Sequence, residues 1–274
     1  MPVHRFTDPE PFLARTRGWL LERPAENAQL LGVAGQALAT PSYYRRALFW
    51  LVEEDGRPLL VAVTNPPRPL MMCQSAEEGL DDLLDSVREA WGELPGVFGP
   101  RPLATGFARR WGGAWREAMA LRLYELREVL PDPRRPEGTL RRALEADLPS
   151  LIHWIEAFDH EAHLTAIPPA EETAARLLEG GRAWFFERGG QRVALVAGAV
   201  DHGILARIGM VYTPPALRGQ GFASAATAAF SEALLQQGAT TCLLFTDLAN
   251  PTSNAIYQRI GYRPVSDWVE LARG

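Results

Sequence analysis

The sequence has few cysteines and no excess of basic residues. Cys73 and Cys242 are the only two cysteines among 274 residues, and both lie in apolar stretches. They fit buried, reduced thiols in a reducing compartment better than a disulfide framework. Lys and Arg number 28 against 33 Asp and Glu, so the formal net charge is −5. This balance does not favour nucleic acid or an anionic membrane as a partner, although net charge does not describe any single face.

Long apolar runs and targeting signals are also missing. No run of about 18 apolar residues occurs, so we expect no membrane-spanning helix. The opening residues MPVHRFTDPEPF lack the basic segment followed by an apolar one that a signal peptide needs. We therefore expect a soluble cytoplasmic protein. The apolar fraction of 47% is ordinary for a globular protein with a core, and the length suggests two domains.

A proline-rich segment divides the chain. Three prolines in PDPRRP, residues 131–136, continue neither a helix nor a strand, so we predict a linker there. We place an N-terminal α/β domain at 1–130 and a second domain at 137–274. In the first domain, apolar patterns predict helices over 10–39 (interrupted near Pro24), 77–91 and 105–119, and strands over 47–52, 59–64, 70–75 and 121–129.

The second domain mixes both kinds of element. Its patterns predict strands over 138–143, 183–187, 192–200, 204–213, 242–247 and 262–271, and helices over 145–162 and 168–178, after the glycine-rich loop to near 237, and from 251 to 260. The order of these elements predicts an α/β (α+β) fold with a mixed central sheet flanked by helices.

The most informative segment is VYTPPALRGQGFAS, residues 211–224. Pro214 and Pro215 stop a buried strand, because neither offers the N–H that a strand ladder needs. Gly219 and Gly221 then precede an Ala-rich helix. Glycines let backbone N–H groups approach a ligand, and the positive end of a helix favours a phosphate. The segment therefore predicts an anion-binding site on a strand–loop–helix.

The segment can be compared with two known phosphate-binding motifs and with a plain helix cap. A P-loop needs Gly-Lys-Ser/Thr, which does not occur. A dinucleotide fingerprint needs a third glycine where Ser224 stands. A glycine-rich turn that only caps a helix and binds nothing remains as the plain structural alternative.

A fourth interpretation depends on spacing. Arg218, Gly221 and Ala223 form R-x-x-G-x-A, which resembles the acetyl-CoA pyrophosphate loop of the GNAT acyltransferase superfamily. In that superfamily the loop joins the fourth strand to the third helix.

A second segment strengthens this resemblance. Asn250, Tyr257 and Gly261-Tyr262 resemble the N-x-x-x-x-x-x-Y-x-x-x-G-[FY] segment of the same superfamily. Asn250 is also a good helix N-cap, and Pro251 suits the first helical position. Two such segments in the right order are more specific than either alone, and the resemblance covers about 137–274.

For the fold, the resemblance implies a GNAT-like C-terminal domain. The element order of the N-terminal half is similar to a degenerate copy of the same fold, although no R-x-x-G-x-[GA] occurs there and 104–109 (ATGFAR) is a poor match. A helper domain that walls off one side of the substrate cleft is the alternative.

For the site, the resemblance implies that acetyl-CoA binds as acyl donor. The residues it assigns to the donor are Val211, Tyr212, Thr213, Arg218, Gly219, Gln220, Gly221, Phe222, Ala223, Ser224, Asn250 and Asn254. The first three would offer backbone groups to the pantetheine arm, and one of their N–H groups would face the oxyanion. N-capping explains Asn250 equally well.

Tyr257 falls on the general-acid position of the superfamily. A phenol with a pKa of about 10 can reprotonate a thiolate; a packing tyrosine is the alternative. No general base is obvious, because many members of the superfamily carry a Glu on the fourth strand and 204–210 has none. The candidates are a water chain or Asp159, His160, Glu161, His163, Asp201 or His202.

Three residues on one helical face could be taken for metal ligands. His153, Glu156 and His160 lie at i, i+3 and i+7. The segment is not H-E-x-x-H, so a helix end lining the acceptor cleft or a solvated polar face is favoured, and we predict no metal.

The resemblance implies a CoA-dependent N-acetyltransferase acting on a small-molecule or peptide amine that the sequence does not identify. A non-catalytic acyl-CoA binding or sensing protein is the main alternative, supported by the missing strand carboxylate. Aminoacyl or peptidyl transfer is a third, but it needs a basic tRNA-binding face that the acidic balance does not favour. Nothing in the sequence indicates the oligomeric state.

Overall fold

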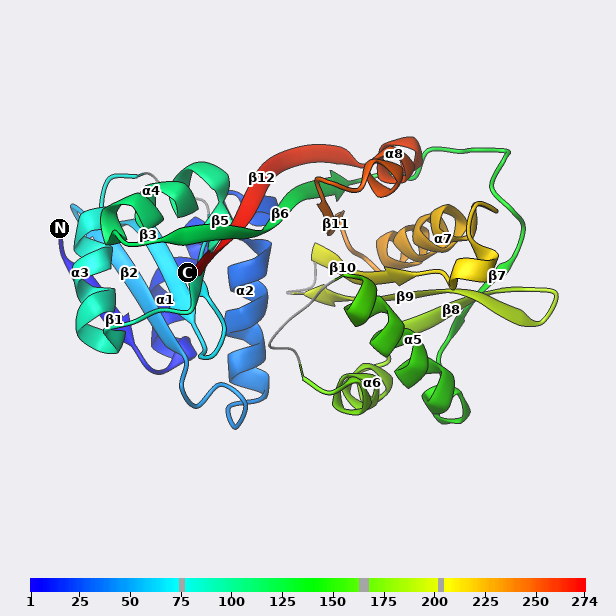
Figure 1. Ribbon diagram of the computed structural model, residues 1–274, viewed down its shortest axis with the longest axis horizontal. Coiled ribbons are helices and arrows are strands. Elements are labelled where there is room, and N and C mark those ends of the chain that lie inside the picture. Colours follow the sequence, from blue (N-terminus) through cyan, green and yellow to red (C-terminus); the bar gives the residue numbers. More distant parts are fainter. Residues whose placement is uncertain (74–76, 163–167, 202–204) are drawn as a thin grey trace. The chain divides into compact units, whose positions relative to one another are not determined.

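The chain divides into two compact units. The computed structural model, drawn in Figure 1, describes residues 1–73, 77–162, 168–201 and 205–274. The first unit contains Met1–Leu123 together with Thr246–Ala249 and Val265–Gly274, and the second contains Tyr124–Phe245 and Asn250–Pro264. The first unit thus includes residues from the end of the chain, and the second begins at Tyr124.

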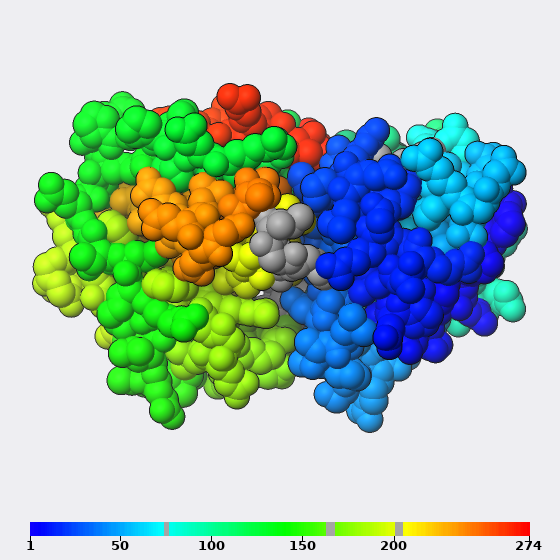
Figure 2. Space-filling view, turned by 180° about the vertical axis from the view of Figure 1, so that it is seen from behind, coloured from blue at the N-terminus to red at the C-terminus, as the bar shows by residue number. Residues whose placement is uncertain are grey.

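The first unit is a sheet with helices packed against it. Its elements are β1 (Val3–Phe6), α1 (Pro9–Leu20), α2 (Pro24–Ala39), β2 (Leu48–Glu54), β3 (Arg57–Thr64), β4 (Leu70–Met72), α3 (Leu80–Trp91), β5 (Gly96–Pro100), α4 (Arg101–Trp111), most of β6 (Trp115–Leu126) and most of β12 (Arg263–Arg273). The strand order is β1-β2-β3-β4-β5-β12-β6. Helix α1 buries Phe12 and Leu20, while its polar side lies at the surface, dark blue in Figure 2.

Local sequence signals fix several of these elements. Pro24 separates α1 from α2 as predicted, because it occupies the first helical position of α2. The strands predicted over 47–52 and 59–64 form the hairpin of β2 and β3, which turns at Asp55 and Gly56 with φ of 50° and 77°. Such left-handed values suit Asp and Gly and give a turn that matches the twist of the strands.

One prediction for the first unit needs correction, and one strand was not predicted. The helix predicted over 105–119 ends at Trp111, because Gly112 and Gly113 both adopt positive φ, and the residues from Trp115 begin the long strand β6. Strand β1 was not predicted. It has four residues and pairs antiparallel with β2, Val3 opposite Val52, so tertiary pairing rather than its own pattern defines it.

The second unit is a mixed sheet with helices on both faces. Its elements are the end of β6, β7 (Thr139–Arg142), the 3-10 turn η1 (Glu145–Asp147), α5 (Leu148–Glu161), α6 (Ala170–Glu179), β8 (Ala183–Arg188), β9 (Gln191–Asp201), β10 (Leu205–Tyr212), the 3-10 turn η2 (Pro215–Leu217), α7 (Phe222–Gln236), most of β11 (Thr241–Asp247) and α8 (Pro251–Ile260). The order β11-β10-β9-β8-β7 is antiparallel except between β10 and β11, which are parallel.

Alternation along β8 separates the two helical layers. Phe185 packs with α5 and α6, whereas its neighbour Phe186 packs with α7 and α8, because successive side chains of a strand point to opposite faces. Figure 1 shows α5 and α6 on one side of these strands and α7 on the other. The predicted strands and helices of this unit are confirmed within a few residues. The first residue of the strand predicted over 204–213 lies outside the described residues.

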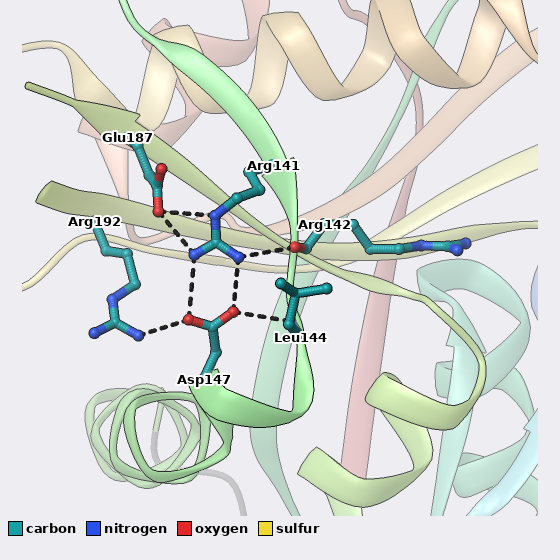
Figure 3. Close-up of polar contacts among 6 residues, drawn as sticks. All are labelled: Arg141, Arg142, Leu144, Asp147, Glu187 and Arg192. Atoms are coloured by element: carbon teal, nitrogen blue, oxygen red, sulfur yellow. Dashed lines mark hydrogen bonds and ion pairs between the residues drawn. The ribbon is translucent and has the colours of Figure 1, made fainter. Parts of the chain in front are cut away.

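A network of charged side chains connects β7, η1, β8 and β9 in this unit (Figure 3). The guanidinium of Arg141 donates to Asp147 at 2.7 Å and to Glu187 at 2.7 Å, and Arg192 donates to Asp147 at 2.8 Å. Asp147 also accepts from the backbone N–H of Leu144 at 2.8 Å. Asp147 immediately precedes α5, but its side chain makes no capping bond to α5 itself.

Both cysteines are buried and neither forms a disulfide. In the part of the chain that the structure describes, every helix is too short or too polar to cross a membrane.

Candidate active site

Two parallel strands of the second unit pair over only part of their length. The register between β10 and β11 runs from Leu205 opposite Thr241 to Ile208 opposite Leu244, yet β10 continues to Tyr212. On its other side β10 stays paired with β9 as far as Tyr212. One edge of β10, from Gly209 onward, therefore offers backbone N–H and C=O groups that β11 does not use.

A bulge lies where this pairing ends. The register between β10 and β9 shifts between Ile208 and Met210, so Gly209 has no opposite residue. Gly209 is exposed, and a Cβ placed there would meet open space. Bulges bend a strand and re-aim its backbone groups, and they are common next to active sites.

The predicted anion-binding segment forms the loop after β10 and leads into the N-terminus of α7. Gly219 and Gly221 have φ of 76° and 81°, which L-residues with side chains rarely adopt. Gly221 is the N-cap of α7, no side chain caps this end, and the first turn contains no acidic residue. A Cβ on Gly221 would lie 3.2 Å from Pro136, whereas one on Gly219 would meet nothing within 4 Å. The helix end can therefore accept an anion.

The remaining residues of the segment surround this helix end. Gln220 is exposed, Ala223 and Ser224 are partly buried in the first turn of α7, and Phe222 is buried in the core between α7 and the sheet. Val211 is partly buried and packs against the same core. All of them lie in the second unit.

Arg218 has partners within the chain. Its Nε donates to the carbonyl of Thr213 at 2.9 Å, and its terminal nitrogen lies 2.6 Å from Glu161, the last residue of α5. The guanidinium also lies over the Tyr212 ring, 5.8 Å from its centroid. Burial, with a smaller contribution from Glu161, raises the pKa of Tyr212 above its ordinary value.

Thr213 carries a polar atom without a partner. Its side chain is 9% exposed, and its Oγ1 is sealed from solvent with no hydrogen bond among the described residues. A buried hydroxyl without a partner is costly. Its place directly before the loop makes it a second indication that the loop receives a polar ligand.

Helix α8 presents the other group of predicted residues. The Asn250 side chain caps α8 by accepting from the N–H of Ser253 at 3.0 Å, and Pro251 occupies the first helical position, as predicted. Gly261 ends the helix with a φ of 117°. Asn254 donates from Nδ2 to the Asn250 carbonyl at 2.8 Å. The side chains of Asn250 and Asn254 are thus both engaged within the chain.

Three tyrosine rings lie in a row beside α8. The Tyr257 ring is 6.4 Å from that of Tyr124 and 5.9 Å from that of Tyr262, between centroids. The Tyr124 hydroxyl donates to Asn254 at 2.9 Å, and the Tyr262 hydroxyl bonds Ser231 at 2.8 Å. The Tyr257 hydroxyl makes no hydrogen bond within the described ranges, and burial raises its pKa to about 12.

Tyr257 shares its core with the strand and loop described above. The cluster that contains Tyr257 also contains Ile208, where the β10–β11 pairing ends, and Phe222, the first residue of α7. The Tyr257 side chain is 8% exposed. The structure thus gathers the end of β10, the glycine loop and Tyr257 in one unit.

The candidate bases differ in their surroundings. Asp159 of α5 is partly buried, makes no ion pair or hydrogen bond to the described residues, and has a pKa raised by burial. Glu161 is engaged with Arg218, and His160 is exposed. His163 and His202 lie outside the described residues, and for Asp201 the structure describes only the backbone.

The helical face of His153, Glu156 and His160 does not gather ligands for a metal. His153, Glu156 and His160 are all exposed on α5. Over the ranges that the structure describes, no group of three His, Cys, Asp or Glu side chains could hold a metal ion.

One residue of this site was missed from the sequence. Tyr124 is fully buried beside α8, yet it lies on β6, within the range predicted as the N-terminal domain. The alternation of Leu121, Leu123, Leu126 and Val129 with charged residues predicts a strand, but nothing in the sequence pairs that strand with α8.

Comparisons with known proteins concern the fold. A family model described as FR47-like protein matches residues 185–269. No curated protein matches the chain. Among solved structures, the chain is similar to an acetyltransferase from the GNAT family of Colwellia psychrerythraea, with 12% identity over 100% of both chains and a TM-score of 0.62.

Two further structures extend this likeness. A GCN5-related N-acetyltransferase from Sphaerobacter thermophilus is 17% identical over 98% of this chain and 94% of that chain, with a TM-score of 0.64. A tandem GNAT protein from the clavulanic acid biosynthesis pathway is 14% identical over 98% of both chains, with a TM-score of 0.60. At such identities the likeness concerns the fold.

The C-terminal half of the chain is GNAT-like, which confirms the predicted fold class. Because the likeness covers the whole chain, the fold is consistent with tandem GNAT-like halves.

Proposed function

We propose that this protein transfers an acyl group, acetyl in the first instance, from CoA to the amine of a small molecule or peptide. Solved structures of a GNAT-family acetyltransferase and a GCN5-related N-acetyltransferase are similar to the chain over almost its full length. Two buried thiols without a disulfide fit a reducing compartment, and we place the reaction in the cytoplasm.

The donor site that we propose fits an acyl-CoA in two respects. The free edge of β10 offers backbone groups of Val211, Tyr212 and Thr213 to an amide-containing arm, as a neighbouring strand would. The open N-terminus of α7, with Gly219 and Gly221 leaving its backbone uncovered, suits a diphosphate. Bound acyl-CoA would supply an activated thioester.

The chain's own residues would do three things in this site. A backbone N–H at the end of β10 would stabilise negative charge that develops on the acyl oxygen. The same backbone edge would fix the direction from which an amine approaches. The Tyr257 hydroxyl would donate a hydrogen bond to the departing sulfur.

The observation that carries the proposal is the uncommitted hydroxyl of Tyr257. Of the three tyrosines in the row, Tyr124 and Tyr262 use their hydroxyls inside the chain, while that of Tyr257 has no partner within the described residues. A phenol with a pKa of about 12 stays protonated at neutral pH. It is a weaker acid than an ordinary thiol, whose pKa is about 8.5, so it suits stabilising charge on sulfur better than complete proton transfer.

The proton of the acceptor amine needs a base. Asp159 fits this role best among the candidate side chains that the structure describes, because its carboxylate is partly buried and has no partner among the described residues. Asn250 and Asn254, in contrast, have their side chains engaged in holding α8, so we give them a supporting role.

The test combines turnover with binding. Thiol release from acetyl-CoA is measured against a panel of amines, amino acids and peptides, and CoA is titrated by calorimetry. We expect acceptor-dependent release that falls at least about 100-fold in Tyr257→Phe, with CoA affinity unchanged. Tyr262→Phe, which removes the hydroxyl of the adjacent tyrosine in the row, should keep the wild-type rate.

Other outcomes separate the alternatives. Tight CoA binding without release across the panel would favour an acyl-CoA binding or sensing protein. No CoA binding at all would mean that the loop from Arg218 to Ser224 is only a helix cap.

A further inference from the structure

A buried hydroxyl from β6 links two side chains of α8. The Tyr124 hydroxyl donates to Asn254 Oδ1 at 2.9 Å and accepts from Gln258 Nε2 at 3.0 Å. The Tyr124 side chain is fully buried. Both bonds have good lengths, so the hydroxyl is satisfied as donor and as acceptor.

The direction of these bonds follows from the surroundings. Asn254 uses Nδ2 to donate to the Asn250 carbonyl at 2.8 Å, which leaves Oδ1 as the atom that faces Tyr124. The Tyr124 proton is therefore committed to Asn254, while Gln258 faces the hydroxyl with Nε2, which can only donate. Tyr124 has no proton left for a ligand, so its role is not that of a second acid.

The two partners flank the proposed hydrogen-bond donor. Asn254 and Gln258 lie three residues before and one residue after Tyr257 on α8. The Tyr124 ring itself lies 6.4 Å from the Tyr257 ring. A single side chain from outside the helix thus fixes α8 both in rotation and along its axis at the turn that presents Tyr257.

We propose that Tyr124 is a positioning residue for acyl transfer, which holds α8 so that the Tyr257 hydroxyl faces the reacting sulfur. This inference rests on the proposed function. It also assigns the N-terminal part of the sequence a direct share in the site, because Tyr124 lies on β6 but belongs to the second unit. Misplacing a reacting group by about 1 Å can cost roughly 100-fold in rate.

The first experiment measures turnover and binding in Tyr124→Phe. This variant keeps the ring and removes both hydrogen bonds to α8. We expect kcat to fall by about 10- to 100-fold, while KM for acetyl-CoA and CoA affinity in calorimetry stay at the wild-type values. A wild-type kcat in Tyr124→Phe, or a raised KM with kcat unchanged, would overturn the proposal.

The matched control is Tyr262→Phe. It also removes one buried hydrogen bond, the 2.8 Å bond to Ser231, and its ring also contacts Tyr257, at 5.9 Å. It does not touch the polar side chains of α8. If Tyr262→Phe lowered kcat as much as Tyr124→Phe, a general loss of packing would explain both and the positioning role would fail.

A double variant tests whether Tyr124 acts through Tyr257. Adding Tyr124→Phe to Tyr257→Phe should cause no further loss of kcat, because the group being positioned is already absent. Multiplying effects would contradict the proposal. Gln258→Ala gives the same test if Tyr124→Phe does not fold, since Gln258 is exposed and its loss removes only one of the two bonds.

A failure of the proposed function can be distinguished from a failure of the positioning role. It would appear as a wild-type protein that releases no thiol with any acceptor. An active wild-type enzyme whose Tyr257→Phe variant is slow, but whose Tyr124→Phe variant is not, would leave the proposed function intact and overturn the positioning role alone.

Discussion

The guanidinium of Arg218 lies 2.6 Å from the carboxylate of Glu161, where the last residue of α5 meets the loop before α7. The two side chains are 47% and 41% exposed. Arg218 is also the residue that we assign to the diphosphate of the donor. A phosphate and Glu161 would therefore compete for the same guanidinium, because each accepts the same charge-assisted hydrogen bonds.

This relationship predicts tighter donor binding when the competing carboxylate is removed. Exposed ion pairs contribute roughly 0.2–1 kcal/mol, so Glu161→Gln should strengthen CoA binding by up to about fivefold. Calorimetric titration of CoA at low salt measures the change. Arg218→Ala should weaken binding instead, because the loop loses its fixed positive charge.

Glu156→Gln is the matched control for this comparison. Glu156 is exposed on the same helix and the same charge is removed, so a general electrostatic effect would appear in both variants. Weaker CoA binding in Glu161→Gln would show that Glu161 supports the loop rather than competing with the donor.

Local chemistry made the glycine loop and α8 predictable from the sequence. Pro214 and Pro215 end a strand, Gly221 begins a helix, and Asn250 with Pro251 begins another. Each of these residues acts on its own backbone or on that of its close neighbours. The boundaries of these elements in the structure agree with those predicted from the sequence.

Long-range pairing was not predictable in the same way. Tyr124 and Asn254 are 130 positions apart, and the role of Tyr124 depends on which strand passes beside α8. Likewise, the helix predicted over 105–119 runs through Gly112 and Gly113, although these residues end α4 and let β6 begin. One sequence does not contain the pairing information that would settle such cases.

The charged network around Asp147 predicts an acid-sensitive contribution to stability. The Arg141 guanidinium holds the pKa of Asp147 below its usual range. Burial acts in the opposite direction, and the hydrogen bond from the Leu144 N–H lowers the pKa further. A depressed pKa in the folded state means that the contribution is fully present above about pH 4 and is lost as pH falls through the folded value.

Asp147→Asn should therefore destabilise the protein near neutral pH by about 2 kcal/mol, because bonds to charged partners are worth roughly 1.5–3 kcal/mol. Urea unfolding of both proteins from neutral to acid pH measures this, and the difference between them should shrink in acid. Asp81→Asn, which removes a mostly exposed carboxylate paired with Arg110, should change stability by less than about 0.5 kcal/mol. A difference that stays constant with pH would contradict the charge-based explanation.

Asp159 predicts an opposite effect on stability together with a loss of activity. Burial raises the pKa of Asp159 above its ordinary value, so the charged form is less favourable in the folded protein than in the unfolded chain. The cost is fully present above the folded pKa and disappears as pH falls and the group takes up a proton. Asp159→Asn should thus stabilise the protein slightly at neutral pH, by about 0.5 kcal/mol or less, since the group is only partly buried.

The same substitution tests whether Asp159 takes the proton from the acceptor amine. A base must be ionised, so wild-type turnover should fall as pH drops through the raised pKa of Asp159. Asp159→Asn should lower kcat by at least about 100-fold, and the remaining activity should lose that dependence on acid pH. Slightly higher stability with unchanged turnover would make Asp159 a bystander and leave a water chain as the route for the proton. Because Glu156→Gln removes an exposed carboxylate from the same helix, it should change neither stability nor the pH profile, which separates the role of Asp159 from the overall charge of α5.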